Sequence, residues 1–212
     1  MFIELVDALR CPVPHEESWL VASADRMEAR HIVEGTLGCP VCRAEYPIRR
    51  GVVDFRREPP RALPPTTTPD AEQAMRLAAF LDLSDATGFA VLVGARGAHA
   101  PLVRAQTDTP LVVIDPPENV EGEPGISVLR CDGALPLAAG AARGVAIDDA
   151  TPERVASAVR ATRVNGRVVA PASTPLPDGV RELARDRTDW VAERQPVASP
   201  VIALHVRRAA RS

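Results

Sequence analysis

The chain has 212 residues, a hydrophobic content of 46% and a formal net charge of −3. This length makes one large domain or two small ones, and the apolar content is sufficient for a buried core. All 25 cationic residues are arginine, but 28 acidic residues outnumber them. This balance argues against a mainly electrostatic nucleic-acid binder, and an aromatic content of 3% is too low for a base-stacking platform.

The sequence also argues against export and against a membrane anchor. No run of 18 apolar residues is present, and Glu4 and Asp7 stand where a secretion signal would carry basic residues. Four cysteines are too few and too unevenly spaced for a disulfide scaffold. We therefore expect a cytoplasmic protein with room for one metal site.

Residues 1–57 predict a small β-rich domain. An amphipathic stretch over 2–10 is followed by apolar runs typical of strands at 19–22, 30–37 and 52–55. Cys39-Pro40-Val41-Cys42 lies between two of these strands. This layout is typical of a zinc ribbon, in which two turns direct ligands toward one ion.

A structural zinc site requires four ligands. Cys39 and Cys42 form one pair and Cys11 begins the other, but Pro14 stands where the second cysteine of that pair would be. His15 is the better substitute and Glu16 the poorer one. The predicted ligands are therefore Cys11, His15, Cys39 and Cys42, and a metal-free ribbon with reduced thiols is the alternative.

A proline-rich segment over 58–69 predicts an extended, polyproline-like linker, because proline interrupts helices and central strands. The predicted second domain covers 70–212. It begins with Asp70 as the N-cap of a helix over 71–81. A later helix is predicted from 152 to about 163, with Pro152 at its first position.

Short, continuously apolar runs alternate with these helices and predict a parallel sheet that is covered on both faces. The last two predicted strands have no helix between them, so we expect them to form an antiparallel pair. The runs lie at 89–93, 111–114, 126–129, 144–147 and 167–171, and the terminal pair at 190–193 and 201–206.

Two blocks in this second part carry a family resemblance. Residues 132–148 contain Asp132-Gly133-Ala134-Leu135-Pro136, and residues 158–169 end in Asn165-Gly166-Arg167-Val168-Val169. Together they resemble the signatures of class I S-adenosylmethionine-dependent methyltransferases that act on small molecules. The resemblance spans roughly 70–207 and implies a Rossmann-like, seven-stranded sheet with a terminal antiparallel hairpin.

The N-terminal part has a separate resemblance. Residues 5–12, 37–42 and 46–53 are similar to the zinc-ribbon activator subunits of tRNA and release-factor methyltransferases, with Arg50 in place of an aspartate. In that family the segment matching 46–55 offers an apolar strand to a methyltransferase. We therefore expect the ribbon to dock on its own chain or to exchange the same contact within a homodimer. A separate protein partner remains open, as does contact of the ribbon arginines with RNA.

The methyltransferase resemblance also implies a cofactor site. Asp115 would accept the ribose hydroxyls of S-adenosylmethionine and Asp132 would contact the adenine, while Gly94 and Gly97 would let the backbone approach the methionyl group. The glycine loop departs from the family pattern, because Val93, Ala95 and His99 replace an acid and two glycines. Arg96 adds a cation to this loop.

The weak candidates for catalysis are Asp148, Asp149 and His99. The two aspartates are equally compatible with helix capping, and the histidine with a structural hydrogen bond. The leading hypothesis is a methyltransferase of unknown substrate, favoured by Asp115 and Asp132. The alternative, favoured by the altered glycine loop, is a non-catalytic, methyltransferase-like scaffold that has lost cofactor binding and acts through protein contacts.

Overall fold

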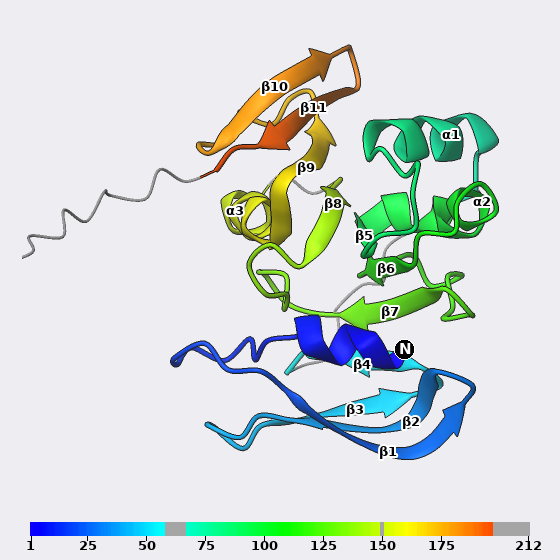
Figure 1. The fold of residues 1–212 in the computed structure, drawn as a ribbon, viewed down its shortest axis with the longest axis vertical. Helices are drawn as coiled ribbons and strands as arrows, with labels where there is room; N and C mark the ends of the chain where they lie inside the picture. Colours follow the sequence, from blue (N-terminus) through cyan, green and yellow to red (C-terminus); the bar gives the residue numbers. More distant parts are fainter. Residues whose placement is uncertain (58–66, 149–150, 197–212) are drawn as a thin grey trace, which may run out of the picture.

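The computed structural model describes residues 1–57, 67–148 and 151–196 and has a mixed α/β fold built on one large sheet (Figure 1). The helical segments are η1 (Ile3–Ala8), α1 (Ala71–Phe80), η2 (Gly94–His99), α2 (Ala100–Arg104) and α3 (Pro152–Ala161), where η marks a 3-10 helix. The strands are β1 (Val21–Glu28), β2 (His31–Gly38), β3 (Glu45–Arg49), β4 (Val52–Asp54), β5 (Ala90–Val93), β6 (Leu111–Ile114), β7 (Ile126–Arg130), β8 (Ala142–Ala146), β9 (Thr162–Pro171), β10 (Val180–Arg185) and β11 (Asp189–Arg194).

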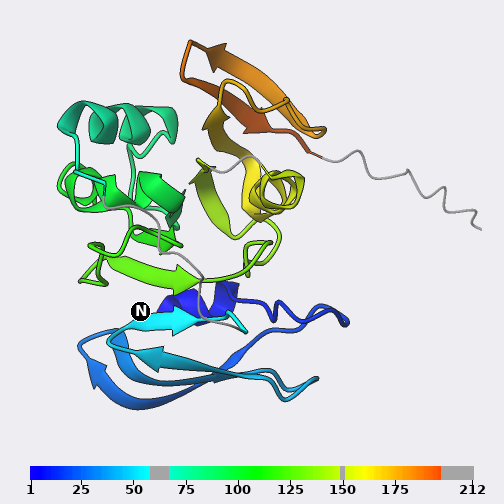
Figure 2. The same ribbon diagram turned by 180° about the vertical axis from the view of Figure 1, so that it is seen from behind.

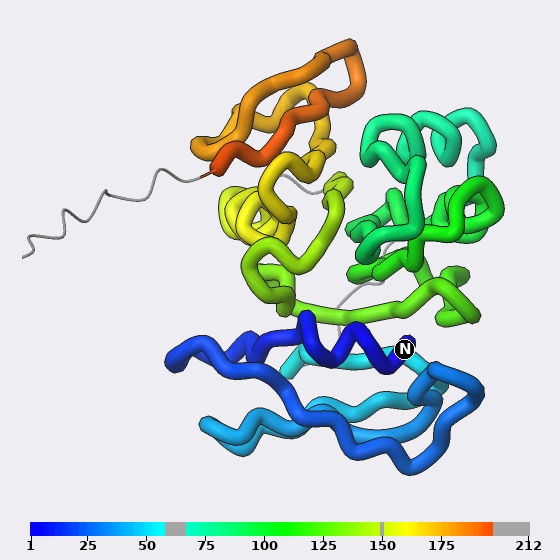
Figure 3. Tube along the Cα trace, viewed as in Figure 1, coloured from blue at the N-terminus to red at the C-terminus, as the bar shows by residue number. Residues whose placement is uncertain are grey.

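The sheet has eleven strands in the order β1-β2-β3-β4-β7-β6-β5-β8-β9-β11-β10, so the expected count of seven is wrong. The difference arises at β7, whose outer edge is not free. There β4 pairs with β7 in parallel, with Val53 opposite Leu129. The cyan β4 and the green β7 run side by side (Figure 3). The N-terminal strands and the later ones therefore share one hydrogen-bonded sheet.

The central strands β7, β6, β5, β8 and β9 are parallel to one another. From β5 the chain proceeds outward through β6 to β7, and then returns to the other side of β5 for β8 and β9. The direction of winding thus reverses between β5 and β8. In open α/β sheets such a topological switch point is where a crevice forms at the carboxyl ends of the strands.

Helices lie on two sides of the sheet (Figure 2), and buried apolar side chains form a cluster on each side. On one face, buried side chains of α1 and α2, including Leu77 and Val103, pack on the central strands. On the other face, η1 and α3 contribute to a cluster that runs from Leu5 through Val53 to Trp190. Residues from both ends of the chain therefore belong to one hydrophobic core.

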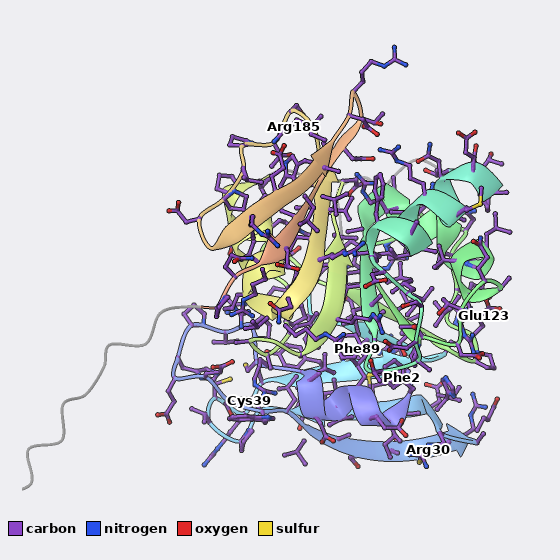
Figure 4. All side chains as sticks on the ribbon, turned by 45° about the horizontal axis from the view of Figure 1, so that its top comes forward. Phe2, Arg30, Cys39, Phe89, Glu123 and Arg185 are labelled. Carbon is purple, nitrogen blue, oxygen red and sulfur yellow. The ribbon has the colours of Figure 1, made fainter. Side chains whose placement is uncertain are left out.

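Phe2 and Phe89 mark one place where the N-terminal segment meets the central sheet. Their rings lie edge to face with centroids 6.3 Å apart (Figure 4), a geometry that adds to the stability gained by burial alone. The backbone N–H of Phe2 also donates to Ser127 Oγ at 3.0 Å. The N-terminal segment is thus joined to β7 by a hydrogen bond as well as by packing.

Local sequence signals are confirmed at several element ends. Asp70 caps α1 by accepting the Gln73 N–H at 2.9 Å, and Pro152 is the first residue of α3. The N-terminal stretch over 2–10 contains the 3-10 helix η1.

In the part of the chain that the structure describes, no helix is long and apolar enough to cross a membrane.

Two predicted boundaries differ from the structure. The α3 helix ends at Ala161 and β9 starts at Thr162, earlier than 167, and the strand bends where Asn165 has a positive φ of 63°. A Cβ on Gly166 would lie 2.3 Å from the Arg143 carbonyl oxygen, so the close approach of β9 to β8 requires glycine. The hairpin partner of β11 is β10, whereas the predicted partner at 201–206 lies outside the described residues.

Candidate functional site

The structure brings the four predicted metal ligands together. The ligand atoms of Cys11, His15, Cys39 and Cys42 all lie within 4.8 Å of one another. Cys11 Sγ is 3.7 Å from Cys42 Sγ, and Cys39 Sγ is 3.5 Å from His15 Nε2. A tetrahedral zinc ion with ordinary bond lengths would place two sulfurs about 3.8 Å apart and a sulfur and a nitrogen about 3.6 Å apart. The cluster could therefore hold a tetrahedral metal ion.

Backbone hydrogen bonds shape the turn that carries two of these ligands. The Cys39 N–H donates to Ala44 O, and the Arg43 N–H donates to Cys39 O, each at 2.9 Å. Burial opposes ionisation of Cys39, but the N–H groups of Cys42 and Val41 outweigh it and lower the pKa of this thiol to about 6. Since the thiolate is the form that binds metal, the turn prepares Cys39 for coordination.

The other two ligands are positioned by their neighbours. The Tyr46 hydroxyl lies 3.3 Å from Cys11 Sγ and can donate a hydrogen bond to it. His15 Nδ1 donates to the carbonyl of Glu16, which leaves the lone pair of Nε2 directed at the cluster. His15 therefore presents a ring nitrogen to the three thiols of the cluster.

We expect His15→Ala to lower the metal content of the purified protein, because it removes one of four ligands and lets water enter the tetrahedral position. Elemental analysis measures the result directly. Glu16→Ala is the matched control, since Glu16 neighbours His15 but is outside the cluster. An unchanged zinc content in His15→Ala would remove His15 from the ligand set.

Side chains of the chain itself crowd the carboxyl ends of β5 and β8, where the switch point would place a crevice. Asp148 follows β8 and accepts a hydrogen bond from the N–H of Ala95 in η2. A Cβ on Gly94 would lie 2.0 Å from the Asp148 carboxylate, and Gly94 has a positive φ of 65°. Glycine at this position thus lets the carboxylate approach the loop.

Arg96 spans the same crevice. Its Nε donates to Ile147 O at 2.8 Å, and its Nη2 forms an ion pair with Asp189 at the start of β11. Asp189 also pairs with Arg76 of α1 at 3.2 Å, and its side chain is only 6% exposed. One largely buried carboxylate therefore ties together the glycine loop, α1 and the terminal hairpin.

Asp115 and Asp132 follow the neighbouring strands β6 and β7. Asp115 has a positive φ of 51°, and its carboxylate accepts the Cys131 N–H at 2.9 Å and pairs with Arg154 of α3 at 2.8 Å. Its side chain remains 20% exposed. Asp132 is exposed and lines a cavity of about 580 Å³ that also contacts Tyr46 and Phe55.

The remaining candidates have local structural partners. Gly97 packs so closely on β6 that a Cβ would lie 2.3 Å from Val113 Cγ1. His99 Nδ1 accepts the Asp70 N–H at 3.1 Å, and burial lowers the pKa of this imidazole. The hydrogen bond engages the basic nitrogen of neutral His99. Asp149 lies outside the described residues.

Sequence reasoning did not find Asp189, which pairs with Arg96, or Arg154, which pairs with Asp115. It also did not find Arg76, the second partner of Asp189. These partners are far away in the sequence and belong to no recognisable motif. Only the strand order could have indicated that β11 begins near the glycine loop.

No family model matches the chain, and no curated protein matches it. Two solved structures are similar to it at low identity. A candidate S-adenosyl-L-methionine-dependent methyltransferase from Methanococcus maripaludis has a TM-score of 0.42 and 11% identity, covering 62% of this chain and 87% of its own. A candidate methyltransferase, YhhF from Escherichia coli, has a TM-score of 0.32 and 12% identity, covering 70% and 94% respectively.

Proposed function

We propose that the chain is a methyltransferase-type protein that binds S-adenosylmethionine at the carboxyl ends of β5, β6 and β7. One observation carries the proposal: an acid, Asp115, follows the strand next to β5, beside the topological switch point. When bound, the cofactor supplies an activated methyl group. The substrate stays open, with RNA, protein and small molecules as the classes to test.

The residues present fit this cofactor in part. The exposed carboxylate of Asp132 and the partly exposed carboxylate of Asp115 can accept hydrogen bonds from adenine and ribose. Gly94, Ala95 and Gly97 would form the loop that receives the methionyl group, and the hydrogen bond from the Ala95 N–H to Asp148 fixes the conformation of this loop. Asp148 is held at the crevice, where it can orient a nucleophile.

A specific observation favours a second candidate, a non-catalytic scaffold. Arg96 fills the crevice through its contacts with Ile147 and Asp189, and Arg154 neutralises Asp115. Each contact has to be exchanged for a ligand contact before the cofactor can bind. If breaking these contacts costs more free energy than the ligand contacts provide, the cofactor does not bind. The domain then acts through protein contacts alone.

Calorimetric titration with S-adenosylmethionine and S-adenosylhomocysteine distinguishes the two candidates. Measurable binding of either ligand supports the methyltransferase-type function. The absence of heat from both ligands at millimolar concentration would leave the scaffold as the function of this domain.

For a protein that binds the cofactor, we expect Asp115→Ala to weaken binding by about 1.5–3 kcal/mol, the value of hydrogen bonds to a charged group. Calorimetry again provides the measurement. Asp108→Ala is the matched control, since its side chain is 93% exposed. Arg154→Ala removes the same ion pair but leaves the Asp115 carboxylate in place and free. It therefore shows whether weaker binding in Asp115→Ala comes from the lost carboxylate or from the lost ion pair. Equal affinity of Asp115→Ala and the wild type would contradict the assignment.

We also propose that Cys11, His15, Cys39 and Cys42 bind a structural zinc ion, in a ribbon of the methyltransferase-activator type. Three thiolates and one imidazole are the ligand types that zinc prefers, and four protein ligands leave no open position for catalysis. The ion would hold the loop that follows η1 against the Cys39–Cys42 turn. In solution we propose a monomer in which this ribbon stays docked through β4.

A further inference from the structure

A second cavity, of about 390 Å³, lies away from the crevice between β5 and β8. Strands β3 and β4 form one wall, and the loop between β6 and β7 forms the other. Side chains alternate between the faces of a strand, so Asp54 and Arg130 point away from the core that buries Val53 and Leu129. The charged residues that line the cavity are Arg49, Arg50, Asp54, Glu118, Glu121 and Arg130.

Arg130 is a partly buried cation without a carboxylate partner. Its Nη1 donates to Pro116 O at 2.7 Å, which fixes the guanidinium at the cavity wall. Among the described residues no carboxylate lies within ion-pair distance of it. The nearby Asp54 is already engaged by Arg56 through two bonds of 2.9 and 2.7 Å. Burial and the charge of Arg56 lower the pKa of Arg130, while the carboxylates of Asp115, Asp54 and Glu118 oppose this shift.

Two more cations reach the same space. Arg49 and Arg50 are exposed at the turn between β3 and β4 and form no ion pair within the described part of the chain. Glu118 and Glu121 lie on the opposite loop, so the cavity has a cationic wall and an anionic wall. The complementary ligand carries an anion at one end and hydroxyl or amino donors at the other.

We propose that this cavity binds a small phosphorylated ligand of the nucleoside monophosphate type, with its phosphate on Arg130 and its hydroxyl or amino groups toward Glu118 and Glu121. A guanidinium matches phosphate oxygens in a bidentate geometry. The volume is within the range of small-molecule sites. The residues that line this cavity are not those proposed to hold the cofactor.

Calorimetric titration of the full chain with adenosine monophosphate, inorganic phosphate and adenosine tests the proposal. We expect the monophosphate to bind, phosphate to bind more weakly, and adenosine not to bind. Arg130→Gln should weaken binding about 10-fold or more, the loss expected when a charged hydrogen-bonding partner is removed. Since Arg130 supports Pro116, the exposed Arg49→Gln serves as a second variant, for which we expect a loss of about 3-fold.

Arg181→Gln, on the distant β10, is the matched control and should leave binding unchanged. Failure of adenosine monophosphate to bind at 10 mM (roughly −2.7 kcal/mol) would overturn the proposal. Full affinity in both Arg130→Gln and Arg49→Gln would overturn it as well.

Discussion

Cys39→Ser is expected to abolish stoichiometric zinc binding and to lower the free energy of unfolding by about 4 kcal/mol or more, since loss of a structural metal is among the largest single-residue effects. Cys39 is buried, and its Sγ lies 3.5 Å from His15 Nε2. Elemental analysis gives the metal content, and denaturant titration gives the free energy. Addition of a chelator to the wild type should reproduce the loss of stability.

Cys131→Ala is the matched control, because Cys131 is a buried thiol outside the cluster. It should keep one zinc per chain and lose only the modest packing energy of a small side chain. A wild type that contains no zinc after purification in zinc-supplemented medium, and that is unaffected by chelators, would establish a metal-free ribbon.

Val53→Asp is expected to be the second most damaging substitution. Val53 is 0% exposed and lies in β4 between β3 and β7, so the new carboxylate would enter the shared core without a partner. The cost of such a buried charge is about 3–5 kcal/mol. Denaturant unfolding measures it, and limited proteolysis within the predicted linker 58–69 should become faster as the N-terminal part detaches from β7.

Val52→Asp provides the control for Val53→Asp. Val52 is on the same strand but faces the cavity with Arg49 and Arg130, where an acid is tolerated. Light scattering of the wild type should give the mass of one chain, and its two fragments should stay together after cleavage within 58–69. Fragments that separate without loss of stability would mean that the ribbon faces a third partner, and a dimer mass would indicate exchange of β4 between chains.

The sequence was sufficient where short-range chemistry decides the structure. The spacing of Cys39 and Cys42 predicts the turn that carries both thiols, which the structure brings together with Cys11 and His15. Continuous apolar runs such as 111–114 mark buried parallel strands, and Asp70 marks a helix start. Each of these signals depends only on residues that are close together in the sequence.

The sequence was insufficient where residues far apart have to meet. Nothing in Val52-Val53-Asp54 shows that this strand will pair with β7, because an apolar strand can pair with many edges. The partner of β11 was likewise placed at 201–206, although β10 precedes it in a tight hairpin. The linear pattern specifies strands but leaves their order in the sheet open.

The same limit applies to the candidate crevice. The sequence by itself indicated the Cys/His cluster, the buried apolar strands and the presence of acids after β6 and β7. Only the tertiary structure decided that Arg96 meets Asp189, that Asp115 meets Arg154, and that the N-terminal ribbon extends the sheet. An ion pair or a strand edge is chosen by distance in space, and that distance is set only when the whole core has formed.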